Sequence, residues 1–367
     1  MDLAVLGMGT SVPPHRISRD ESIEVAKILA NCDSDQAASL TVLYNHTDIT
    51  GRHMIIGREV LQDVLQGTHK SGSRFVPRGP TDSGPDTAER MRVYQREALP
   101  LALEACKEAL GEAHWDGADI THLVTVSCTG FAAPGFDIGL IKKLNVPATV
   151  ARTHIGFMGC HGAFNALRVA RAFLEGGAGV RVLVCAMELS SLHYYYTWNP
   201  KRMVGNALFG DGAAALAAGP DRDYPSERWR LVASGSCLFP DSEQALTWSI
   251  GNHGFDMTLS TRVPNLIAAH LRPWLKEWLA GLGFTIPQIG SWAIHPGGPR
   301  ILNSIEESLG LARGTAAASR NILHEFGNMS SPTILFILER LRRRSAPLPC
   351  VALGFGPGMV VEGMLFV

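Results

Sequence analysis

Apolar positions along the first 220 residues follow two alternating periods. Short runs that are almost continuously apolar predict β-strands buried on both faces, whereas longer segments with an apolar residue every three or four positions predict helices. The predicted strands are a run that begins at Leu3 and residues 120–130, 148–157, 180–189 and 210–219; the predicted helices are residues 20–32, 86–112 and 160–177. This half of the chain therefore alternates strands with helices.

Three segments have features beyond their period. Pro100 lies inside the predicted helix at 86–112 and is expected to kink or split it, because proline lacks an amide hydrogen. In the helix at 160–177, apolar residues cover most of the circumference, which predicts burial between two layers. Residues 68–86 are rich in Ser, Gly and Pro and predict a surface loop.

The second half of the chain repeats the alternation after a charged, proline-bearing stretch at residues 220–230. Its predicted strands are residues 229–238, 291–298, 350–356 and 359–367, and its predicted helices are residues 263–282, 300–310 and 331–344. Apolar strands that alternate with helices indicate an α/β fold in which helices cover both faces of mixed sheets. We therefore expect two halves of similar strand-helix order, residues 1–220 and 221–367, which suggests a duplication.

Composition and charge exclude several classes of protein. With 367 residues, of which 46% are hydrophobic and 18% charged, the chain can bury one large core or two medium ones. A formal net charge of -1 argues against a nucleic-acid surface, which needs clustered positive charge. The acidic second residue and short apolar run at the start do not fit a signal peptide, and no run of 18 apolar residues predicts a membrane span. We expect a soluble, cytoplasmic protein.

The seven cysteines are an odd number and show no CxxC spacing. This pattern excludes the common zinc ribbons and favours reduced thiols, so no metal site is predicted. Because a buried cysteine packs like a small hydrophobic residue, six of the seven are interpreted as packing residues. The exception is Cys160.

Cys160 lies between two glycines in GFMGCHGAF, where a loop leads into the apolar helix. At the start of a helix, free amide groups and the helix dipole stabilise a thiolate, which makes the sulfur a nucleophile. The alternative interpretation is a small side chain that packs at a helix start. His161 follows directly, and because consecutive helical residues point about 100° apart, we do not expect it to share a proton with the sulfur.

Two polar residues elsewhere in the chain could assist a nucleophilic cysteine. His295 ends an apolar strand, and Asn328 lies between a glycine and the start of a helix. Imidazole and carboxamide N–H groups can stabilise the oxyanion of an acyl transfer. Taken singly, each could also be a core, turn or cap residue. Together with Cys160 they stand at strand-to-helix junctions, which gather at one edge of the sheets in α/β proteins, so we expect one active site.

Five segments resemble, in the same order, the signature segments of type III polyketide synthases, the chalcone synthase family of the thiolase superfamily. They are GFMGCHGAFNALRVA, VGNALFGDGAAA, WAIHPGGPRIL, HEFGNMSSPTILFIL and GFGPGMVVEG. The segment SCTGFAAPGFD at 127–137 resembles the bacterial branch, whereas the first 80 residues match only loosely. The resemblance implies a thiolase-like, five-layered αβαβα fold with two pseudo-symmetric halves, the first carrying Cys160 and the second carrying His295 and Asn328.

This resemblance also implies a mechanism. Cys160 takes an acyl starter from a coenzyme A thioester, and His295 and Asn328 polarise the thioester carbonyl of malonyl-CoA, which loses carbon dioxide to leave an enolate. His295 is also expected to pair with the Cys160 thiolate in the resting enzyme. The product is a cyclised pyrone, resorcinol or related polyketide. Coenzyme A thioesters are substrates, and no cofactor is implied.

The walls of the substrate cavity follow from the same resemblance. Phe209 occupies the position of the family's gatekeeper phenylalanine, and Met257 that of a second phenylalanine in the plant enzymes; without the family, Phe209 could equally be a core residue. The nearest candidates for the coenzyme A phosphates are Arg52 and His53. The other expected substrate-binding residues are Glu188, Ser190, Ser330 and Pro357.

Malonyl-CoA and an acyl-CoA starter are the implied partners. The starter is expected to be fatty acyl, a starter borne by an acyl carrier protein is the alternative, and the family implies a homodimer. The alternative functions are a ketoacyl synthase III-like enzyme, which performs a single condensation, and a non-catalytic homologue. The segments HPGGPRIL and GFGPG favour the polyketide synthase over the ketoacyl synthase III-like enzyme. The retention of Cys160, His295 and Asn328 argues against a non-catalytic homologue. A papain-like protease would need a CGSCW-like segment, which the chain lacks.

Overall fold

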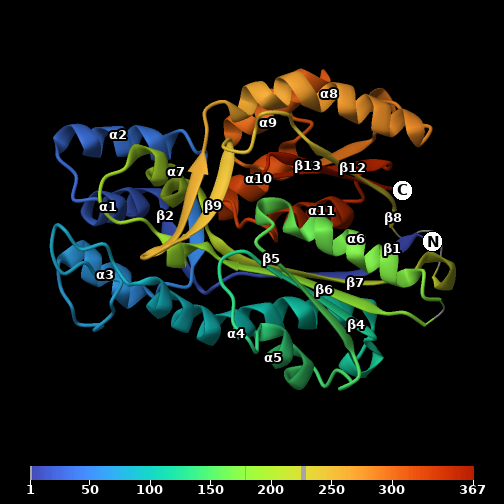
Figure 1. The fold of residues 1–367 in the computed structure, drawn as a ribbon, viewed down its shortest axis with the longest axis horizontal. Coiled ribbons are helices and arrows are strands. Elements are labelled where there is room, and N and C mark those ends of the chain that lie inside the picture. Colours follow the sequence, from blue (N-terminus) through green and yellow to red (C-terminus); the bar gives the residue numbers. More distant parts are fainter. Residues whose placement is uncertain (1, 178, 225–228) are drawn as a thin grey trace.

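The core of the molecule is one nine-stranded mixed sheet (Figure 1). The computed structural model describes residues 2–177, 179–224 and 229–367. In spatial order the strands are β11 (Ser291–Ile294), β12 (Cys350–Gly356), β13 (Val360–Phe366), β8 (Arg230–Leu238), β1 (Leu3–Ser11), β7 (Asp211–Pro220), β6 (Val182–Leu189), β4 (His122–Ser127) and β5 (Ala151–Gly156). Each of these strands coincides with a predicted apolar run.

The sheet bends back on itself, so that its two parts form separate layers. The bend lies between β1 and β8, which pair through Leu3 with Leu231 and Ala4 with Arg230. Helices lie between the parts and cover each outer face (Figure 1). The middle helices are α6 (Gly162–Leu174) and α11 (Thr333–Arg343); α8 (Val263–Gly281) and α9 (Pro299–Leu309) cover the β11 to β8 part, and α4 (Thr87–Ala113) and α5 (Phe136–Lys143) cover the other. This is the expected αβαβα arrangement of a thiolase-like fold.

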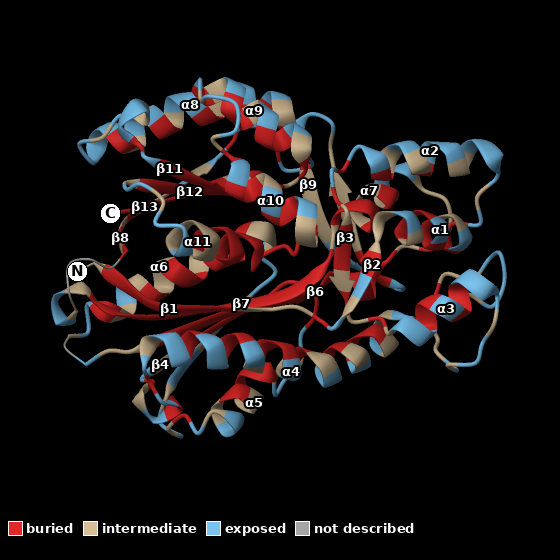
Figure 2. Ribbon diagram, turned by 180° about the vertical axis from the view of Figure 1, so that it is seen from behind, coloured by how far each residue is buried: buried red, intermediate tan, exposed pale blue. Residues whose placement is uncertain are grey.

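The two middle helices are apolar because a sheet covers them on both sides. Buried residues of α6 and a continuous buried run of α11, Ile334 to Leu338, belong to a single hydrophobic cluster. This cluster also contains side chains of β1, β4, β6 and β7 from one part of the sheet and of β12 and β13 from the other. The predicted burial of the helix at 160–177 is therefore confirmed (Figure 2).

Helix α4 is continuous from Thr87 to Ala113 and Pro100 does not divide it. The helix begins at a capping box, in which the Asp86 side chain accepts from the Glu89 amide at 2.7 Å. Pro100 is exposed, so the backbone carbonyl that lacks an amide partner there can bond to water. An exposed proline is therefore tolerated in this long helix, and the predicted split does not occur.

A region that we call the cap lies at the end of the molecule opposite the two termini (Figure 1). Its elements are β2 (His15–Ser18), α1 (Arg19–Leu29), α2 (Ser34–Asn45), β3 (Gly51–Met54), α3 (Arg58–Gln66), α7 (Pro200–Leu208), β9 (Leu246–Gly251) and β10 (Gly254–Leu259). The hydrophobic pattern predicted α1 but not the other, mostly short elements. The loop at 68–86 has no helix or strand, as predicted, although Phe75 and Val76 are buried.

No helix among the described residues has the length and apolar content needed to cross a membrane. The boundary predicted between the two halves, at residue 220, coincides with the end of β7. Residues 225–228, in the stretch at 220–230, lie outside the described residues. The division into residues 1–220 and 221–367 stays a prediction.

We predict that Gly9→Ala destabilises the protein by about 1–3 kcal/mol, because a Cβ atom at Gly9 would collide with the Ala105 carbonyl of α4. Gly111→Ala, in α4 but without a neighbouring atom within 4 Å, is the matched control and should stabilise by about 0.5–1 kcal/mol. The free energy of unfolding from urea titration measures both effects. A Gly9→Ala protein as stable as the wild type would contradict the close packing of β1 on α4.

Candidate active site

Three segments that are far apart in the sequence bring Cys160, His295 and Asn328 to one cavity. Cys160 lies in a single 3-10 turn, Gly159–His161, ahead of α6; His295 follows β11; and Asn328 follows α10 (Ala317–Phe326). All three residues line a cavity of about 450 Å³ whose other walls are mainly apolar. The structure therefore brings together the three residues that their positions at strand-to-helix junctions predicted to share one site.

The backbone before Cys160 approaches a neighbouring loop closely. Gly159 has a φ of 73°, and a Cβ atom there would lie 2.5 Å from the ring of Pro357. Its amide donates to the Cys128 sulfur at 3.0 Å. Only glycine combines this φ with this approach. Helix α6 begins at Gly162 and not at Cys160 as predicted, so the sulfur lies in the turn ahead of the helix.

Burial controls the acidity of the Cys160 thiol. The Ser330 hydroxyl donates to the sulfur at 3.6 Å, and the Asn328 side chain also hydrogen-bonds to it. Burial nevertheless raises the pKa of Cys160 to about 11, and these hydrogen bonds oppose only part of the effect. The raised pKa disagrees with the expectation of a resting Cys160 thiolate, because desolvation favours the neutral thiol at pH 7.

His295 is buried and neutral. It is 2% exposed, and among the described residues neither ring nitrogen has a hydrogen-bond partner, so the expected pairing with a Cys160 thiolate is absent. Burial lowers the pKa of His295 to about 3, so at neutral pH the imidazole has one donor and one acceptor nitrogen. An unpartnered buried polar group costs about 1–3 kcal/mol, so both nitrogens are available to hydrogen-bond with a molecule in the cavity.

Hydrogen bonds hold both the backbone and the side chain of Asn328. Its backbone amide donates to the Leu208 carbonyl at 2.9 Å, and its backbone carbonyl accepts from the Gly210 amide at 3.0 Å. Its Oδ1 accepts from the Ser330 amide at 2.7 Å, which leaves the NH2 group for an acceptor in the cavity. Together with the His295 imidazole, two N–H donors thus line the cavity that Cys160 also lines, and such donors can stabilise an oxyanion.

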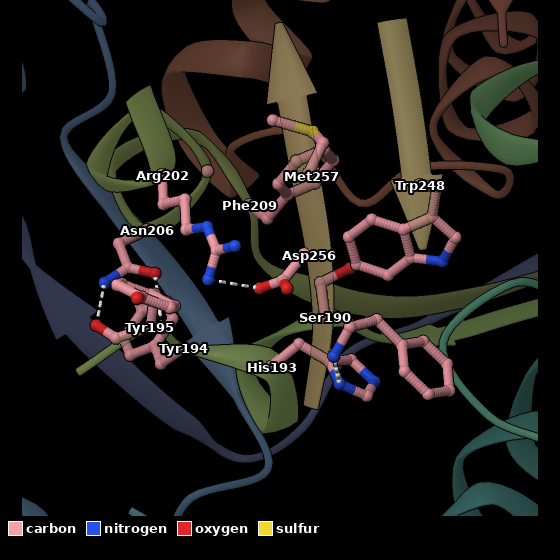
Figure 3. Close-up of a pocket in the computed structure, with 12 residues that line it drawn as sticks. Ser190, His193, Tyr194, Tyr195, Arg202, Asn206, Phe209, Trp248, Asp256 and Met257 are labelled. Atoms are coloured by element: carbon pink, nitrogen blue, oxygen red, sulfur yellow. Dashed lines mark hydrogen bonds and ion pairs between the residues drawn. The ribbon is translucent and has the colours of Figure 1, made fainter. Parts of the chain in front are cut away.

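Phe209 and Met257 each line three cavities, one of which is drawn in Figure 3. Both line the cavity described above, a second of about 390 Å³ that also includes Cys160, and a third of about 360 Å³ that extends away from it. Other expected substrate-binding residues that line the second cavity are Ser190, Ser330 and Pro357. These positions agree with a role in substrate binding, which stays a prediction.

Glu188 does not line these three cavities, contrary to expectation. Its buried carboxylate accepts from the amides of Cys128 at 2.9 Å and Thr129 at 3.0 Å, and from the Ser331 hydroxyl at 2.5 Å. Burial raises the pKa of Glu188, and these donors oppose the rise. Glu188 therefore positions the loop after β4 and the segment beside Ser330 from outside these three cavities.

The structure also contradicts the expectation that Arg52 binds the coenzyme A phosphates. Arg52 is 1% exposed, and its guanidinium donates to the backbone carbonyls of Asn206 and Phe209 and lies 5.6 Å from the Tyr44 ring. A group enclosed in this way cannot reach the phosphates of coenzyme A. Instead, it supports the backbone that carries Phe209, because a buried cation needs acceptors around it.

The β9–β10 hairpin contributes residues that sequence analysis missed. Trp248 lines the second and third cavities, and its indole N–H donates to the Cys128 carbonyl at 2.7 Å. Outside the hairpin, sequence analysis also missed Thr129, which lines the second cavity. The hairpin has a detectable signal, since apolar and polar residues alternate in LTWSIG and GFDMTL on either side of a glycine-bearing turn.

Comparison with known proteins gives matches along the whole chain. Residues 2–222 match the N-terminal domain, and residues 230–367 the C-terminal domain, of chalcone and stilbene synthases. The chain is 31% identical over 369 residues to the alpha-pyrone synthesis polyketide synthase-like Pks18 of Mycobacterium tuberculosis, covering 98% of this chain and 90% of that protein. It is 32% identical over 387 residues to bisdemethoxycurcumin synthase of Oryza sativa subsp. japonica, covering 99% and 91%.

Solved structures share all the layers of the fold. PKS-I from the brown alga Ectocarpus siliculosus superposes with a TM-score of 0.91 at 29% identity, covering 100% of this chain and 98% of that chain. The C-terminal type III polyketide synthase domain of Steely1 from Dictyostelium superposes with a TM-score of 0.87 at 26% identity, covering 100% and 99%.

We predict that alkylation of Cys160 by iodoacetamide accelerates about tenfold per pH unit between pH 7 and 10. Only the thiolate reacts, and burial holds the pKa of Cys160 at about 11. Mass spectrometry of the Cys160 peptide follows the reaction. Ser330→Ala should slow it in this range, because the substitution removes a hydrogen bond that lowers the pKa. A rate that levels off below pH 8 would reveal a resting thiolate and contradict the effect of burial.

Proposed function

The chain belongs to the chalcone and stilbene synthase family, the type III polyketide synthases, and we propose that Cys160, His295 and Asn328 perform its acyl transfer and decarboxylative condensation. The observation that carries this proposal is the neutral, unpartnered imidazole of His295 in the cavity that Cys160 and Asn328 also line. The chemistry requires a nucleophile for the acyl group and N–H donors for an oxyanion, and this cavity contains both.

In the loading step, the Cys160 sulfur attacks the thioester carbonyl of an acyl-CoA starter. A carbon–sulfur bond forms to Cys160, and the bond to the coenzyme A sulfur breaks. Because the thiol is protonated at neutral pH, its proton must move as the new bond forms. The acceptor nitrogen of neutral His295 lines the same cavity and can take it, and the proton then goes to the departing coenzyme A thiolate.

In the extension step, His295 and Asn328 donate N–H groups to the thioester oxygen of malonyl-CoA. The malonyl carboxylate leaves as carbon dioxide, and its electron pair passes into an enolate. The enolate carbon attacks the acyl carbonyl on Cys160, so that a carbon–carbon bond forms and the sulfur is released. No separate base is required, and each donor to the oxyanion contributes about 3–4 kcal/mol.

The starter that we propose is fatty acyl, and the product is a cyclised pyrone, resorcinol or related polyketide. The side chains around the cavity of Cys160 and His295 are mainly apolar, among them Leu208, Leu259 and Ile301, which suits an acyl chain. The relative Pks18 is named for alpha-pyrone synthesis, which supports a pyrone as one product class.

Arg262 and Arg300 are the residues that we propose for the coenzyme A phosphates in place of Arg52. Both are exposed, and each precedes a residue that lines the cavity of Cys160 and His295, namely Val263 and Ile301. They stand at the N-terminal ends of α8 and α9, where free amides and the helix dipole favour anions. The same pair could accept the phosphopantetheine arm of an acyl carrier protein, which stays the alternative starter donor.

A homodimer in the cytoplasm completes the proposal. Strand β5 lies at the edge of the sheet, and Phe157 and Met158, which follow it, are each 38% exposed. An open strand edge flanked by exposed apolar side chains favours pairing with a second copy of the chain.

Purified protein with malonyl-CoA and a panel of acyl-CoA starters should release carbon dioxide and form cyclised products, whose masses count the condensations. Cys160→Ala should abolish starter loading, measured by intact-protein mass spectrometry. His295→Gln and Asn328→Asp should slow malonyl-CoA decarboxylation by about 100-fold or more, and loading by less. Cys237→Ala, in β8 and outside the three cavities, is the matched control. Normal product from Cys160→Ala would refute the proposal, and a lone diketide would favour a single-condensation enzyme.

The double substitution Arg262→Ser and Arg300→Ser should raise the KM for malonyl-CoA about tenfold at low salt with kcat unchanged, because two charges near the phosphates are lost. The malonyl thioester of N-acetylcysteamine has no phosphate, so the variant and the wild type should use it equally well. Arg313→Ser, another exposed arginine, is the control. An unchanged KM for malonyl-CoA in the double variant would overturn this role.

A further inference from the structure

The third cavity, of about 360 Å³, has a polar end that the proposed reaction does not use (Figure 3). It meets the second cavity at four shared residues: Ser190, Phe209, Trp248 and Met257. From there it continues between α7 and β10, where Arg202 and Asp256 line it. Aromatic side chains form much of its wall, namely Tyr194, Tyr195, Trp248 and Phe255.

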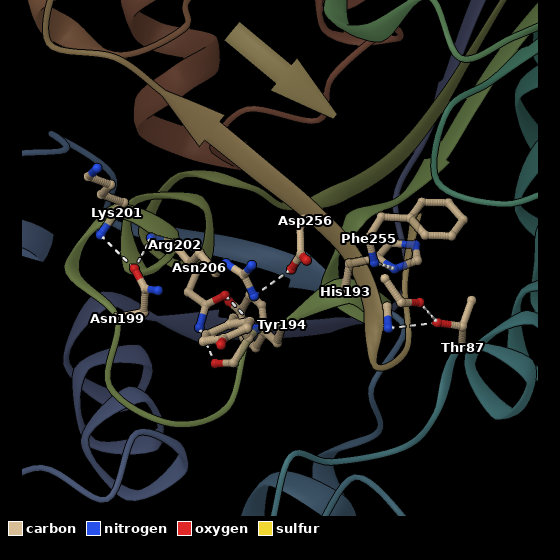
Figure 4. A network of polar contacts seen from close by, with 12 residues as sticks. Thr87, His193, Tyr194, Asn199, Lys201, Arg202, Asn206, Phe255 and Asp256 are labelled. Carbon is tan, nitrogen blue, oxygen red and sulfur yellow. Dashed lines mark hydrogen bonds and ion pairs between the residues drawn. The ribbon is translucent and has the colours of Figure 1, made fainter. Parts of the chain in front are cut away.

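Two polar side chains of this cavity are already occupied by the protein (Figure 4). The His193 Nδ1 accepts from the Phe255 amide at 3.0 Å, and its Nε2 donates to the Thr129 carbonyl at 2.6 Å. The Asn206 side chain bonds at both ends to the backbone of Tyr195, at 2.9 and 2.8 Å. These residues shape the wall and offer little to a ligand.

Ser190 and Arg202 retain hydrogen-bonding capacity. Ser190 is 6% exposed, and its hydroxyl has no partner among the described residues. The Arg202 guanidinium pairs with Asp256 at 2.9 Å and lies 4.5 Å from the centroid of the Tyr195 ring. A guanidinium has five N–H groups and a carboxylate has two oxygens. This single contact therefore leaves N–H donors of Arg202 and an acceptor oxygen of Asp256 available to a ligand.

We propose that Ser190, Arg202 and Asp256 bind a hydroxyl group at the end of the acyl starter remote from its thioester. A hydroxyl group accepts and donates, so it can bond to an Arg202 N–H and an Asp256 oxygen together. The inference rests on the proposed loading of the starter on Cys160. It narrows the starter to a fatty or aryl acyl group with a distal hydroxyl.

The charges of this subsite select a neutral ligand. The ion pair has no net charge, and Asp256 would repel a carboxylate that approached Arg202. The pair is about one-third exposed, so its contribution to folding stability is small, and stability alone does not account for its position at the end of the cavity. The Tyr195 ring, itself held through its backbone by Asn206, fixes the guanidinium in place.

Matched starters that differ by one hydroxyl test the proposal: dodecanoyl-CoA against ω-hydroxydodecanoyl-CoA, and cinnamoyl-CoA against para-hydroxycinnamoyl-CoA. We expect kcat/KM in the wild type to favour the hydroxylated member of at least one pair about tenfold. Arg202→Met and Asp256→Asn should lower this ratio to about one, mainly because kcat/KM for the hydroxylated member falls. Lys201→Met, an exposed neighbour of Arg202 on α7, is the matched control and should keep the wild-type ratio.

The other outcomes separate this subsite from the proposed function. Ser190→Ala leaves the ion pair in place and should lower the ratio about threefold, which tests the subsite even if Arg202→Met does not fold. A wild-type ratio of one in both pairs, an unchanged ratio in the variants, or equal loss for both members of a pair would overturn the subsite, while acylated Cys160 would still support the proposed function. Failure of every starter to acylate Cys160 would overturn the proposed function and the subsite with it.

Discussion

Desolvation of the Cys160 sulfur is the constraint on which the chemistry of this protein depends. Burial raises the pKa of Cys160 to about 11 and lowers that of His295 to about 3, so both groups are neutral at pH 7. A neutral imidazole offers a donor and an acceptor at once, and a mainly apolar cavity strengthens a hydrogen bond to an oxyanion. In the proposed reaction, the Cys160 thiol must therefore lose its proton as it attacks the thioester.

The layered fold creates this buried site. Helices α6 and α11 fill the space between the two parts of the sheet, so the segments that carry Cys160 and Ser330 lie at the ends of buried helices. The buried carboxylate of Glu188 joins the loop after β4 to Ser331. Ser330 has a φ of 60°, a strained conformation that these contacts maintain and that directs its hydroxyl to the sulfur.

The cap supplies many of the side chains that line the second and third cavities. Beside the sulfur and His295, the walls are mainly apolar, whereas the far end between α7 and β10 carries the pair of Arg202 and Asp256. Trp248 from the β9–β10 hairpin stands between these two environments. In the proposed function, short elements with exposed outer faces thus contribute to specificity, while the groups proposed to be catalytic adjoin the long, buried elements of the sheet and the middle helices.

The sequence by itself determined the order of strands and helices, the burial of the middle helices and the three residues that meet at the site. Periodicity and the position of Cys160 at a strand-to-helix junction are local properties, so neighbouring residues reveal them. Only the tertiary structure decided that Arg52 is enclosed, that Glu188 binds backbone amides, and that the Cys160 thiol keeps its proton. Solvent exposure and hydrogen-bond partners decide charge and access, and both come from residues far away in the chain, such as Asn206 for Arg52.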